Sequence, residues 1–320
     1  MRLLIARCLT LSILAASAAA QAPQLGPAQV PPGDLGSLEA GGVQHAPRLA
    51  PGGEGALAVW VDHRAEFSSP LQGDGGPDVF AMRMGPDGQP MDAVALRLPG
   101  APGDKEELRA AWNGSAWLVV WENQDTFGGF NTKHVLGARV SADGLLLDAE
   151  PLVIKADFDT TSGTLALASD GVDWLLTVQG LPSASTGIAA FRIGADGSLL
   201  NPGGTLLTTL ATAMGRGDLE YADGVYLLTF SPGAPTQGLR FDDRLSPLGS
   251  VFTIGSGSSS RPRAATDGND FLVVWENASA GGSHLRARRI DAITGAQSAV
   301  LQITPSSNGD VTVDPDVAWT

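Results

Sequence analysis

Apolar positions in this chain come in short runs separated by turn residues, and the stretch from 109 to 123 shows the pattern most fully. Arg109 to Trp112 leads into Asn113-Gly114, and an uninterrupted apolar run follows from Trp117 to Trp121. Asn-Gly between two apolar runs predicts a β-hairpin with a type I′ turn, which needs positive φ at both central residues. The apolar run has no polar face, so it predicts a strand that is buried on both sides.

This hairpin recurs along the chain at intervals of 45 to 61 residues. The apolar strand appears five times, ending at Trp60, Trp121, Val178, Phe230 and Trp275. The turn before it also recurs, as Gly52-Gly53, Asn113-Gly114, Asp170-Gly171, Asp223-Gly224 and Asp267-Gly268. The chain is therefore built from internal repeats.

A second hairpin follows in each repeat. Its first strand carries an arginine at a fixed place, namely Arg83, Arg139, Arg192, Arg240 and Arg289. In the first three repeats an Asp-Gly turn comes four residues later, at Asp87-Gly88, Asp143-Gly144 and Asp196-Gly197, and a fourth short strand ends each repeat. We interpret the arginines as structural, with packed stems and with heads paired to acids.

Four antiparallel strands repeated about every fifty residues predict an all-β fold, a β-propeller with one blade per repeat. Fifty residues are too few for the main alternative, a row of small β-sandwich domains. The predicted propeller covers 46–320, with repeats at about 46–99, 107–154, 163–208, 216–254 and 260–303.

The last ten residues resemble the first strand of a further repeat. Pro315-Asp316-Val317-Ala318-Trp319 matches Pro262-Arg263-Ala264-Ala265 of the preceding one. We therefore expect five complete blades and the start of a sixth in 311–320. Two interpretations follow: this strand closes a five-bladed ring together with the N-terminal segment, or the sequence is truncated before a sixth blade. We favour truncation.

The N-terminal residues predict export. Arg2 and Arg7 precede an apolar stretch, and small residues end it near Ala20, which is typical of a cleavable signal peptide over 1–20. Residues 21–45 are expected to be a loose leader with one strand at Leu35–Glu39. We expect a secreted or periplasmic protein. Its only cysteine, Cys8, leaves with the signal, so no disulfide or thiolate site is expected.

Charge excludes some partners. Without the signal, Lys and Arg fall from 20 to 18 against 34 acidic residues. Such an acidic surface repels nucleic acid and anionic membranes. We expect an extracellular glycan or protein as partner, no membrane insertion and a monomeric chain.

The repeats resemble the LVVWE-type β-propeller repeats of exported bacterial proteins, in Ala111 to Glu122 and Ala138 to Gly144 and more weakly over 46–320. The resemblance implies the blade fold and an exported protein. It implies no particular activity, because such proteins are mostly uncharacterised.

Candidate chemistry lies on one predicted face. The loops between the second and third strands are long, at 62–77, 122–133, 179–186, 231–236 and 276–283, and variable loops on a rigid scaffold often bind ligands. The candidate ligand-binding residues at the ends of the apolar strands are Asp62, Arg64, Glu122, Asn123, Glu276 and Asn277. These carboxylates could hold sugar hydroxyls or a cation, or supply an acid/base pair. A structural role within each blade is the alternative that their recurrence favours.

Further motifs are few. No histidine pair has metal-ligand spacing, and no phosphate loop, dinucleotide fingerprint or nucleophile elbow is present, so no metal, cofactor or catalytic residue is predicted. Trp112 and Trp319 fall on first strands and could line a central channel, where they could stack on a sugar. The preferred function is a secreted, non-enzymatic propeller that binds a carbohydrate, peptide or protein through its long-loop face. The alternatives are an extracellular glycan hydrolase or lyase that uses Asp62, Glu122 or Glu276, and a structural module of a truncated surface protein.

Overall fold

The computed structural model describes residues 44–63, 76–125, 132–158, 165–181, 184–209, 215–279, 282–304 and 315–318. The predicted signal peptide, the predicted strand Leu35–Glu39 and nearly all of the leader lie outside these residues. The described residues form strands, turns and irregular segments without a helix, so none of them forms a helix that could cross a membrane.

The strands form five four-stranded antiparallel sheets, each made of four consecutive strands. Blade 1 contains β1 (Gln44–Gly52), β2 (Gly55–Asp62), β3 (Asp78–Met84) and β4 (Leu96–Arg97). Blade 2 contains β5 (Asp104–Trp112), β6 (Ala116–Asp125), β7 (Thr132–Ser141) and β8 (Leu152–Phe158). Blade 3 contains β9 (Ala166–Ser169), β10 (Trp174–Leu181), β11 (Ala184–Ile193) and β12 (Thr205–Thr209). Blade 4 contains β13 (Gly217–Ala222), β14 (Val225–Phe230), β15 (Gln237–Asp242) and β16 (Phe252–Thr253). Blade 5 contains β17 (Ser258–Thr266), β18 (Asp270–Ser279), β19 (Gly282–Asp291) and β20 (Leu301–Gln302).

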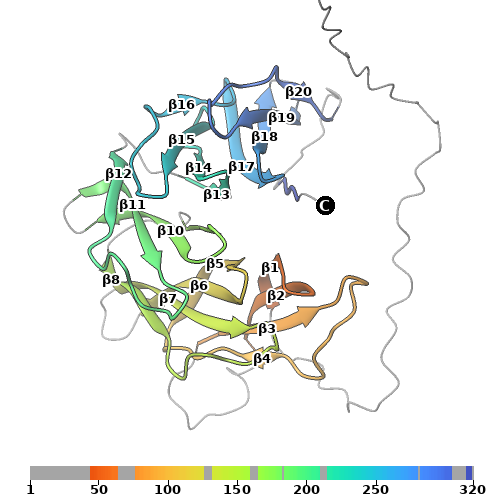
Figure 1. The fold of residues 1–320 in the computed structure, drawn as a ribbon, viewed down its shortest axis with the longest axis vertical. Coiled ribbons are helices and arrows are strands. Elements are labelled where there is room, and N and C mark those ends of the chain that lie inside the picture. Colours follow the sequence, from red (N-terminus) through yellow and green to blue (C-terminus); the bar gives the residue numbers. More distant parts are fainter. Residues whose placement is uncertain are drawn as a thin grey trace, which may run out of the picture. The chain divides into compact units, whose positions relative to one another are not determined.

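The blades follow one another in chain order around a ring, with the first strand of each blade innermost (Figure 1). Successive first strands contact one another, from β1 to β5, β9, β13 and β17. The protein is a five-bladed β-propeller, as the repeats predict. The start of a sixth blade is not seen as a strand, because Pro315–Ala318 is described without regular secondary structure.

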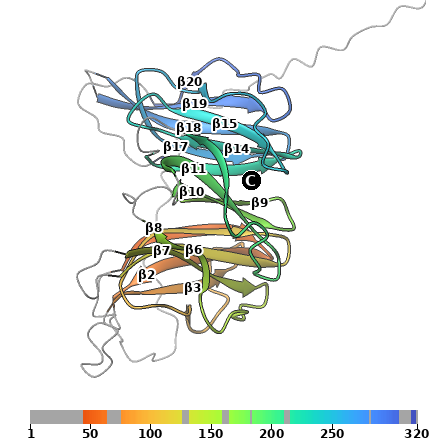
Figure 2. The same ribbon diagram turned by 90° about the vertical axis from the view of Figure 1, so that its left-hand side faces the viewer.

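Side chains of facing blades form the core. One hydrophobic cluster fills each space between successive blades, from blades 1 and 2 through blades 4 and 5. The side view shows sheets lying face to face (Figure 2). Because the second strand lies between two such clusters, both of its faces are buried: Val119 and Trp121 pack in one cluster and Leu118 and Val120 in the next.

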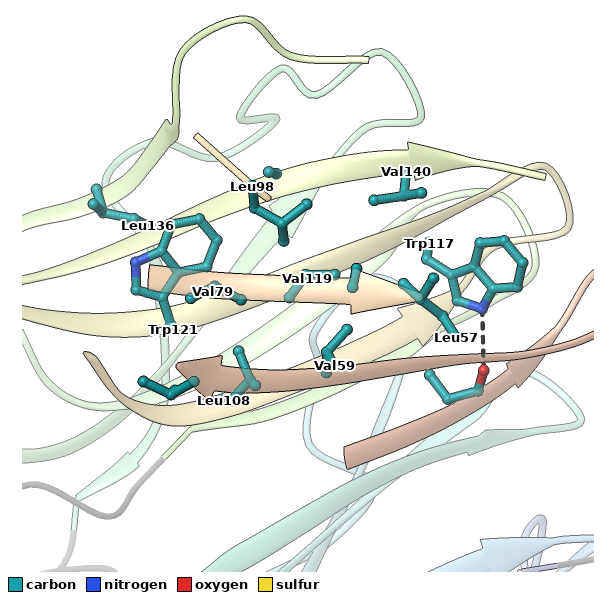
Figure 3. Packing of buried hydrophobic residues seen from close by; sticks show 14 residues of the cluster. Leu57, Val59, Val79, Leu98, Leu108, Trp117, Val119, Trp121, Leu136 and Val140 are labelled. Carbon is teal, nitrogen blue, oxygen red and sulfur yellow. Dashed lines mark hydrogen bonds between the residues drawn. The ribbon is translucent and has the colours of Figure 1, made fainter. Parts of the chain in front are cut away.

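The aromatic residue that opens the second strand also ties blades together in two cases. The indole N–H of Trp117 donates a 3.1 Å hydrogen bond to the carbonyl oxygen of Ala50 on blade 1 (Figure 3). Trp174 makes the equivalent bond to Ala111 of blade 2, at 2.9 Å. These bonds satisfy buried donors and fix the spacing of neighbouring blades.

The hairpin prediction is confirmed, but the predicted turn type is wrong in most blades. Asp223-Gly224 has positive φ at both residues, as a type I′ turn requires, whereas Asn113-Gly114, Asp170-Gly171 and Asp267-Gly268 have positive φ at the glycine alone. At Asn113 the side-chain Oδ1 instead accepts hydrogen bonds from the backbone N–H groups of Ser115 and Ala116. Asp170 and Asp267 do the same in their own turns, so the recurring Asn or Asp acts as a side-chain cap of the turn.

The predicted long segments between the second and third strands are confirmed in blades 1 and 4 and wrong in blades 2, 3 and 5. In blade 1, β2 ends at Asp62 and β3 begins at Asp78, and in blade 4, β14 ends at Phe230 and β15 begins at Gln237. In blade 2, β6 runs to Asp125 and β7 begins at Thr132. In blades 3 and 5 the two strands stay paired almost to the turn, and the last pairs are Leu181 with Ala184 and Ser279 with Gly282. Polar residues interrupt the apolar pattern here, but backbone pairing between the two strands continues past them.

The fixed arginines link each blade to the next. The Nη1 groups of Arg83 and Arg139 donate to the carbonyl oxygens of Ala142 and Ala195, at 2.9 Å and 2.7 Å. Arg192 bonds the Asp243 carbonyl, and Arg240 bonds that of Ile293, in the same way. Arg83, Arg139, Arg192 and Arg289 also pair with acids, as in Arg139 with Asp148 at 2.6 Å. The arginines are structural as predicted, and four of them also join blades.

Candidate functional site

The innermost strands carry charged residues at one equivalent position around the ring. Backbone pairing with the second strand defines this position, occupied by Arg48, Arg109, Ala166, Asp218 and Arg263. We call Arg48, Arg109, Asp218 and Arg263 the axial cluster. Sequence reasoning missed the cluster, although alignment of the repeats on the apolar strand would have shown three arginines at one place.

A backbone irregularity precedes each axial arginine. The pairing of β1, β5 and β17 skips two residues just before Arg48, Arg109 and Arg263. The first skipped residue has positive φ in each case: Ala46 at 53°, Glu107 at 50° and Arg261 at 50°. Blades 3 and 4, which lack the arginine, show no such shift between their first two strands. Bulges redirect side chains, and non-glycine residues in the left-handed region are strained. Three blades therefore contain the same strained bulge, and each time it orients an arginine.

The arginine heads are held alike. The Nη1 of each donates to the carbonyl oxygen of the residue before it, namely Pro47, Leu108 and Pro262, at 2.9 to 3.0 Å. Arg109 also pairs with Glu107 at 3.0 Å. Neither Arg48 nor Arg263 has an ion pair with any described residue. Two half-buried guanidinium groups thus remain without a carboxylate in contact.

The arginines lie close enough to affect one another. Burial lowers the pKa of Arg48, and the positive charge of Arg263 lowers this pKa further. Burial also lowers the pKa of Arg109, with added repulsion from Arg48 and Arg263. Arginine stays protonated in proteins, so these shifts report burial first and nearby positive charge second, rather than a neutral side chain.

Acids on β13 complete the cluster. Asp218 accepts hydrogen bonds from the backbone N–H groups of Leu219 and, in blade 5, of Ala264. Burial raises the pKa of Asp218, although Arg263 opposes the rise. Glu220 lies two residues further along, on the same face of the strand, and burial together with the Asp218 charge raises its pKa well above the usual value. The axis therefore presents two carboxyl groups on one strand beside the arginines.

The predicted ligand-binding carboxylates lie elsewhere, at the ends of the second strands, and are buried. Asp62 accepts hydrogen bonds from Gln44 and Trp60, at 3.1 and 3.2 Å. Glu276 pairs with Arg261 at 2.5 Å. Each of these bonds lies within one blade, which supports the structural alternative for these two acids.

The third carboxylate, Glu122, is also buried and faces two lysines. The Nζ of Lys133 lies 3.3 Å from its Oε2. Burial raises the pKa of Glu122, and Lys133 opposes the rise. Burial lowers the pKa of Lys155 on β8 to about 8, and Glu122 partly counters this shift. This is an internal charge pair of blade 2.

The predicted amides have clear structural roles. Asn123 donates to the carbonyl oxygen of Pro102 at 2.8 Å, and Asn277 donates to that of Ser256 at 3.0 Å. Both bonds hold the segment that enters the blade. Arg64, the remaining predicted residue, lies outside the described residues. Among the residues that are described, no group of three or more His, Cys, Asp or Glu side chains could hold a metal ion.

Of the two tryptophans predicted to line the channel, Trp112 packs against Trp117 with ring centroids 4.5 Å apart and joins the core of blades 1 and 2. Trp319 lies outside the described residues. Stacking on a sugar therefore gains no support from Trp112.

Comparisons with known proteins agree on the fold alone. No family model matches the chain, and no curated protein matches its sequence. Among solved structures it is similar to a GH43_1 enzyme from Xanthomonas citri, with 12% identity over 81% of this chain and 92% of the other and a TM-score of 0.47. It is also similar to a putative TolB from Agrobacterium tumefaciens, with 14% identity over 80% of each chain and a TM-score of 0.43. Both are propeller proteins, and neither likeness supports an argument about activity.

Proposed function

We propose that this protein is an exported, non-enzymatic β-propeller that binds an anionic group of an extracellular carbohydrate or peptide at the axial cluster. The observation that carries the proposal is the pair of half-buried arginines, Arg48 and Arg263, that have no ion pair and lie near Arg109. This proposal retains the predicted class of partner but moves the ligand's contact from Asp62, Glu122 and Glu276 to the axis.

The chemistry of the arginines favours a carboxylate or sulfate group. A guanidinium is planar and always charged, and its N–H groups match two oxygens of one carboxylate. Partly buried positive charge without a carboxylate in contact is costly, so a structure that holds it by strained bulges gains when an anion binds. The export signal and the resemblance to exported LVVWE-type repeats are the sequence support for an extracellular ligand.

Binding of charged and neutral oligosaccharides tests the proposal. We expect an oligomer of galacturonic acid to bind, and its methyl ester, which lacks the charge, to bind at least tenfold more weakly. A glutamate-rich peptide of similar charge distinguishes a peptide source from a carbohydrate source. Arg109→Gln should weaken binding about tenfold or more, whereas Arg244→Gln, at an exposed turn, should leave it unchanged. Equal binding by the acid and its ester would contradict the proposal.

The second candidate is a glycan hydrolase or lyase, and one observation favours it. Asp218 and Glu220 share one strand face at the axis, and the pKa of Glu220 is raised well above the usual value, as a general acid requires. This candidate predicts release of reducing ends from a polysaccharide, lost in Glu220→Gln. If the parent protein shows no turnover and the Glu220→Gln variant still binds, the hydrolase or lyase candidate is excluded and the binding function is the one that remains.

A further inference from the structure

Blades 1 and 5, the first and last of the series, each have one exposed face. In the other blades the equivalent face is buried against a neighbouring blade. In blade 1, Leu49 has its side chain 64% exposed. The equivalent residue by strand pairing in blade 4 is Leu219, which is 1% exposed. Trp60 is only half-buried, whereas its counterpart Trp121 is fully buried. This face of blade 1 would meet a preceding blade.

Blade 5 shows the complementary surface. Ile303, just after β20, is 53% exposed, while its counterparts Leu98, Ile154, Leu207 and Ile254 are between 1% and 6% exposed. Leu301 is exposed as well, whereas its counterparts Leu96 and Leu152 pack in the cores between blades. No hydrophobic cluster of the described residues lies between blade 5 and blade 1.

The series of arginine hydrogen bonds between successive blades also ends at these two faces, one on blade 1 and one on blade 5. Arg139 crosses to blade 3, where a Cβ on Gly197 would lie 2.9 Å from its Nε. Among the described residues, Arg289 of blade 5 pairs with acids of its own blade alone, and its side chain is 47% exposed, against 13% for Arg139. Gly88 of blade 1 has a similar positive φ, 75° against 84° at Gly197, but a Cβ there would have nothing within 4 Å. Among the described residues, Arg289 therefore has no turn of a following blade to bind, and the turn at Gly88 has no arginine from a preceding blade.

A segment of the chain lies at the axis between these faces. Pro315-Asp316 repeats the Pro47-Arg48 and Pro262-Arg263 pairs, which puts Asp316 at the position of the axial residues. Pro315 is buried, and Asp316 is close enough to Arg48 for its charge to oppose the lowering of the Arg48 pKa.

We propose that the surfaces of Leu49 and Ile303 are the two walls of a sixth-blade site, and that its occupant is another copy of this repeat with Pro315–Ala318 in its innermost strand. The required partner chemistry is specific on both sides. The occupant must offer a glycine turn with a free carbonyl to Arg289, an arginine to Gly88, and apolar side chains to both walls. A blade of this protein's own repeat meets all three requirements.

The test adds to the chain the three strands that such a blade would need beyond its innermost strand. Residues 113–158, the second to fourth strands of blade 2, are attached directly after Trp319, which stands where Trp112 does. A control extension has the same length but carries serine at its apolar positions. Single cysteines, Leu49→Cys and Ile303→Cys, are placed in a Cys8→Ser background, and their reaction with a maleimide is timed. Val172→Cys is the exposed reference and Ile254→Cys the buried one.

In the parent chain we expect both wall thiols to react about as fast as the exposed reference. In the extended chain they should react at least tenfold more slowly, and the midpoint of thermal unfolding should rise. The serine extension should change neither. Arg289→Gln should lower the unfolding midpoint more in the extended chain than in the parent, because only there does it lose a bond to the next blade.

Three results would overturn the proposal. Slow labelling of both walls in the parent, at every protein concentration, would mean that the five blades close on themselves. Slow labelling only at high concentration would mean that a second copy covers the walls. Fast labelling in an extended chain that folds would mean that a sixth blade does not fit.

Discussion

The guanidinium of Arg139 on β7 reaches the carbonyl oxygen of Ala195, 56 residues away in the next blade, at 2.7 Å. The same side chain pairs with Asp148 of its own blade, so one residue holds a turn in its own sheet and a turn in the neighbouring sheet. Four successive repeats contain this link between blades. The arginine therefore stabilises its own blade and also the interface with the next blade.

Arg139→Gln should lower the free energy of unfolding by about 1.5–3 kcal/mol, because it removes charged hydrogen bonds on both sides of a blade joint. Arg289→Gln should cost only about 0–1 kcal/mol in the parent chain, because its ion pair is half exposed and lies within one blade. Urea unfolding of both variants measures the difference. Equal losses would mean that the bond between blades contributes little.

Gly197→Ala should be more destabilising than Gly88→Ala. Both glycines have left-handed backbones, at φ 84° and 75°, so both substitutions carry a strain of about 1–2 kcal/mol. Only at Gly197 does the added methyl group meet an arginine from the preceding blade. The difference between the two variants in urea unfolding isolates the contact. If Gly88→Ala is equally harmful, something in solution also covers that turn.

Asn113→Asp should destabilise the joint between blades 2 and 3 while leaving the hairpin intact. Asn113 is buried, its Oδ1 caps the turn, and its Nδ2 donates to the carbonyl oxygen of Val172 at 2.7 Å. Aspartate keeps the cap, as in blades 3 and 5, but turns a donor into a charged acceptor facing that carbonyl. The expected loss is about 1–3 kcal/mol in urea unfolding at neutral pH, and it should shrink at low pH, where the carboxyl is protonated. A loss that does not depend on pH would contradict this account.

Glu220 should make stability fall as the pH rises above about 4.5, the usual pKa of glutamate. Its folded-state pKa is raised, so the folded protein retains a proton that the unfolded chain releases, and each further rise in pH up to the folded pKa favours unfolding. Glu220→Gln should raise stability at neutral pH and flatten the pH profile. Unfolding midpoints between pH 4 and 8 provide the measurement. An unchanged slope would mean that the carboxyl ionises freely at the axis.

The repeat pattern predicts most of the fold. Hairpin turns appear in the sequence as recurring Asn-Gly or Asp-Gly pairs, and strands buried on both faces appear as recurring apolar runs. The apolar run from Trp117 to Trp121 lies in the second strand, and the arginine series beginning at Arg83 lies in the third strands, as expected. The partner of each arginine in the next blade could not be predicted, because the sequence contains no information on which turn a neighbouring sheet presents. The long-loop prediction failed in blade 2 because β6 and β7 continue through polar residues that show no apolar alternation.

The axial cluster was hidden for another physical reason. In the sequence, Arg48, Arg109 and Arg263 look like surface residues of short first strands. The bulge before each one, which decides where the side chain points, depends on backbone conformation at Ala46, Glu107 and Arg261, and these three residue types have nothing in common. Conversely, Glu122 and Glu276 looked like a ring of ligand contacts, but their neighbours Lys133 and Arg261 are recognised only when the strands are paired.

Among the described residues, blades 5 and 1 share no hydrophobic cluster, and this predicts that the blades differ in how readily they unfold. Blades 2, 3 and 4 each share hydrophobic clusters with two neighbours, while blades 1 and 5 each share one. In repeat proteins, stability is close to a sum over neighbouring interfaces, and amides exchange fastest where the fewest interfaces must open. Amide hydrogens of β1–β4 and β17–β20 should therefore exchange before those of β9–β12, so that the chain opens from its two ends towards its middle.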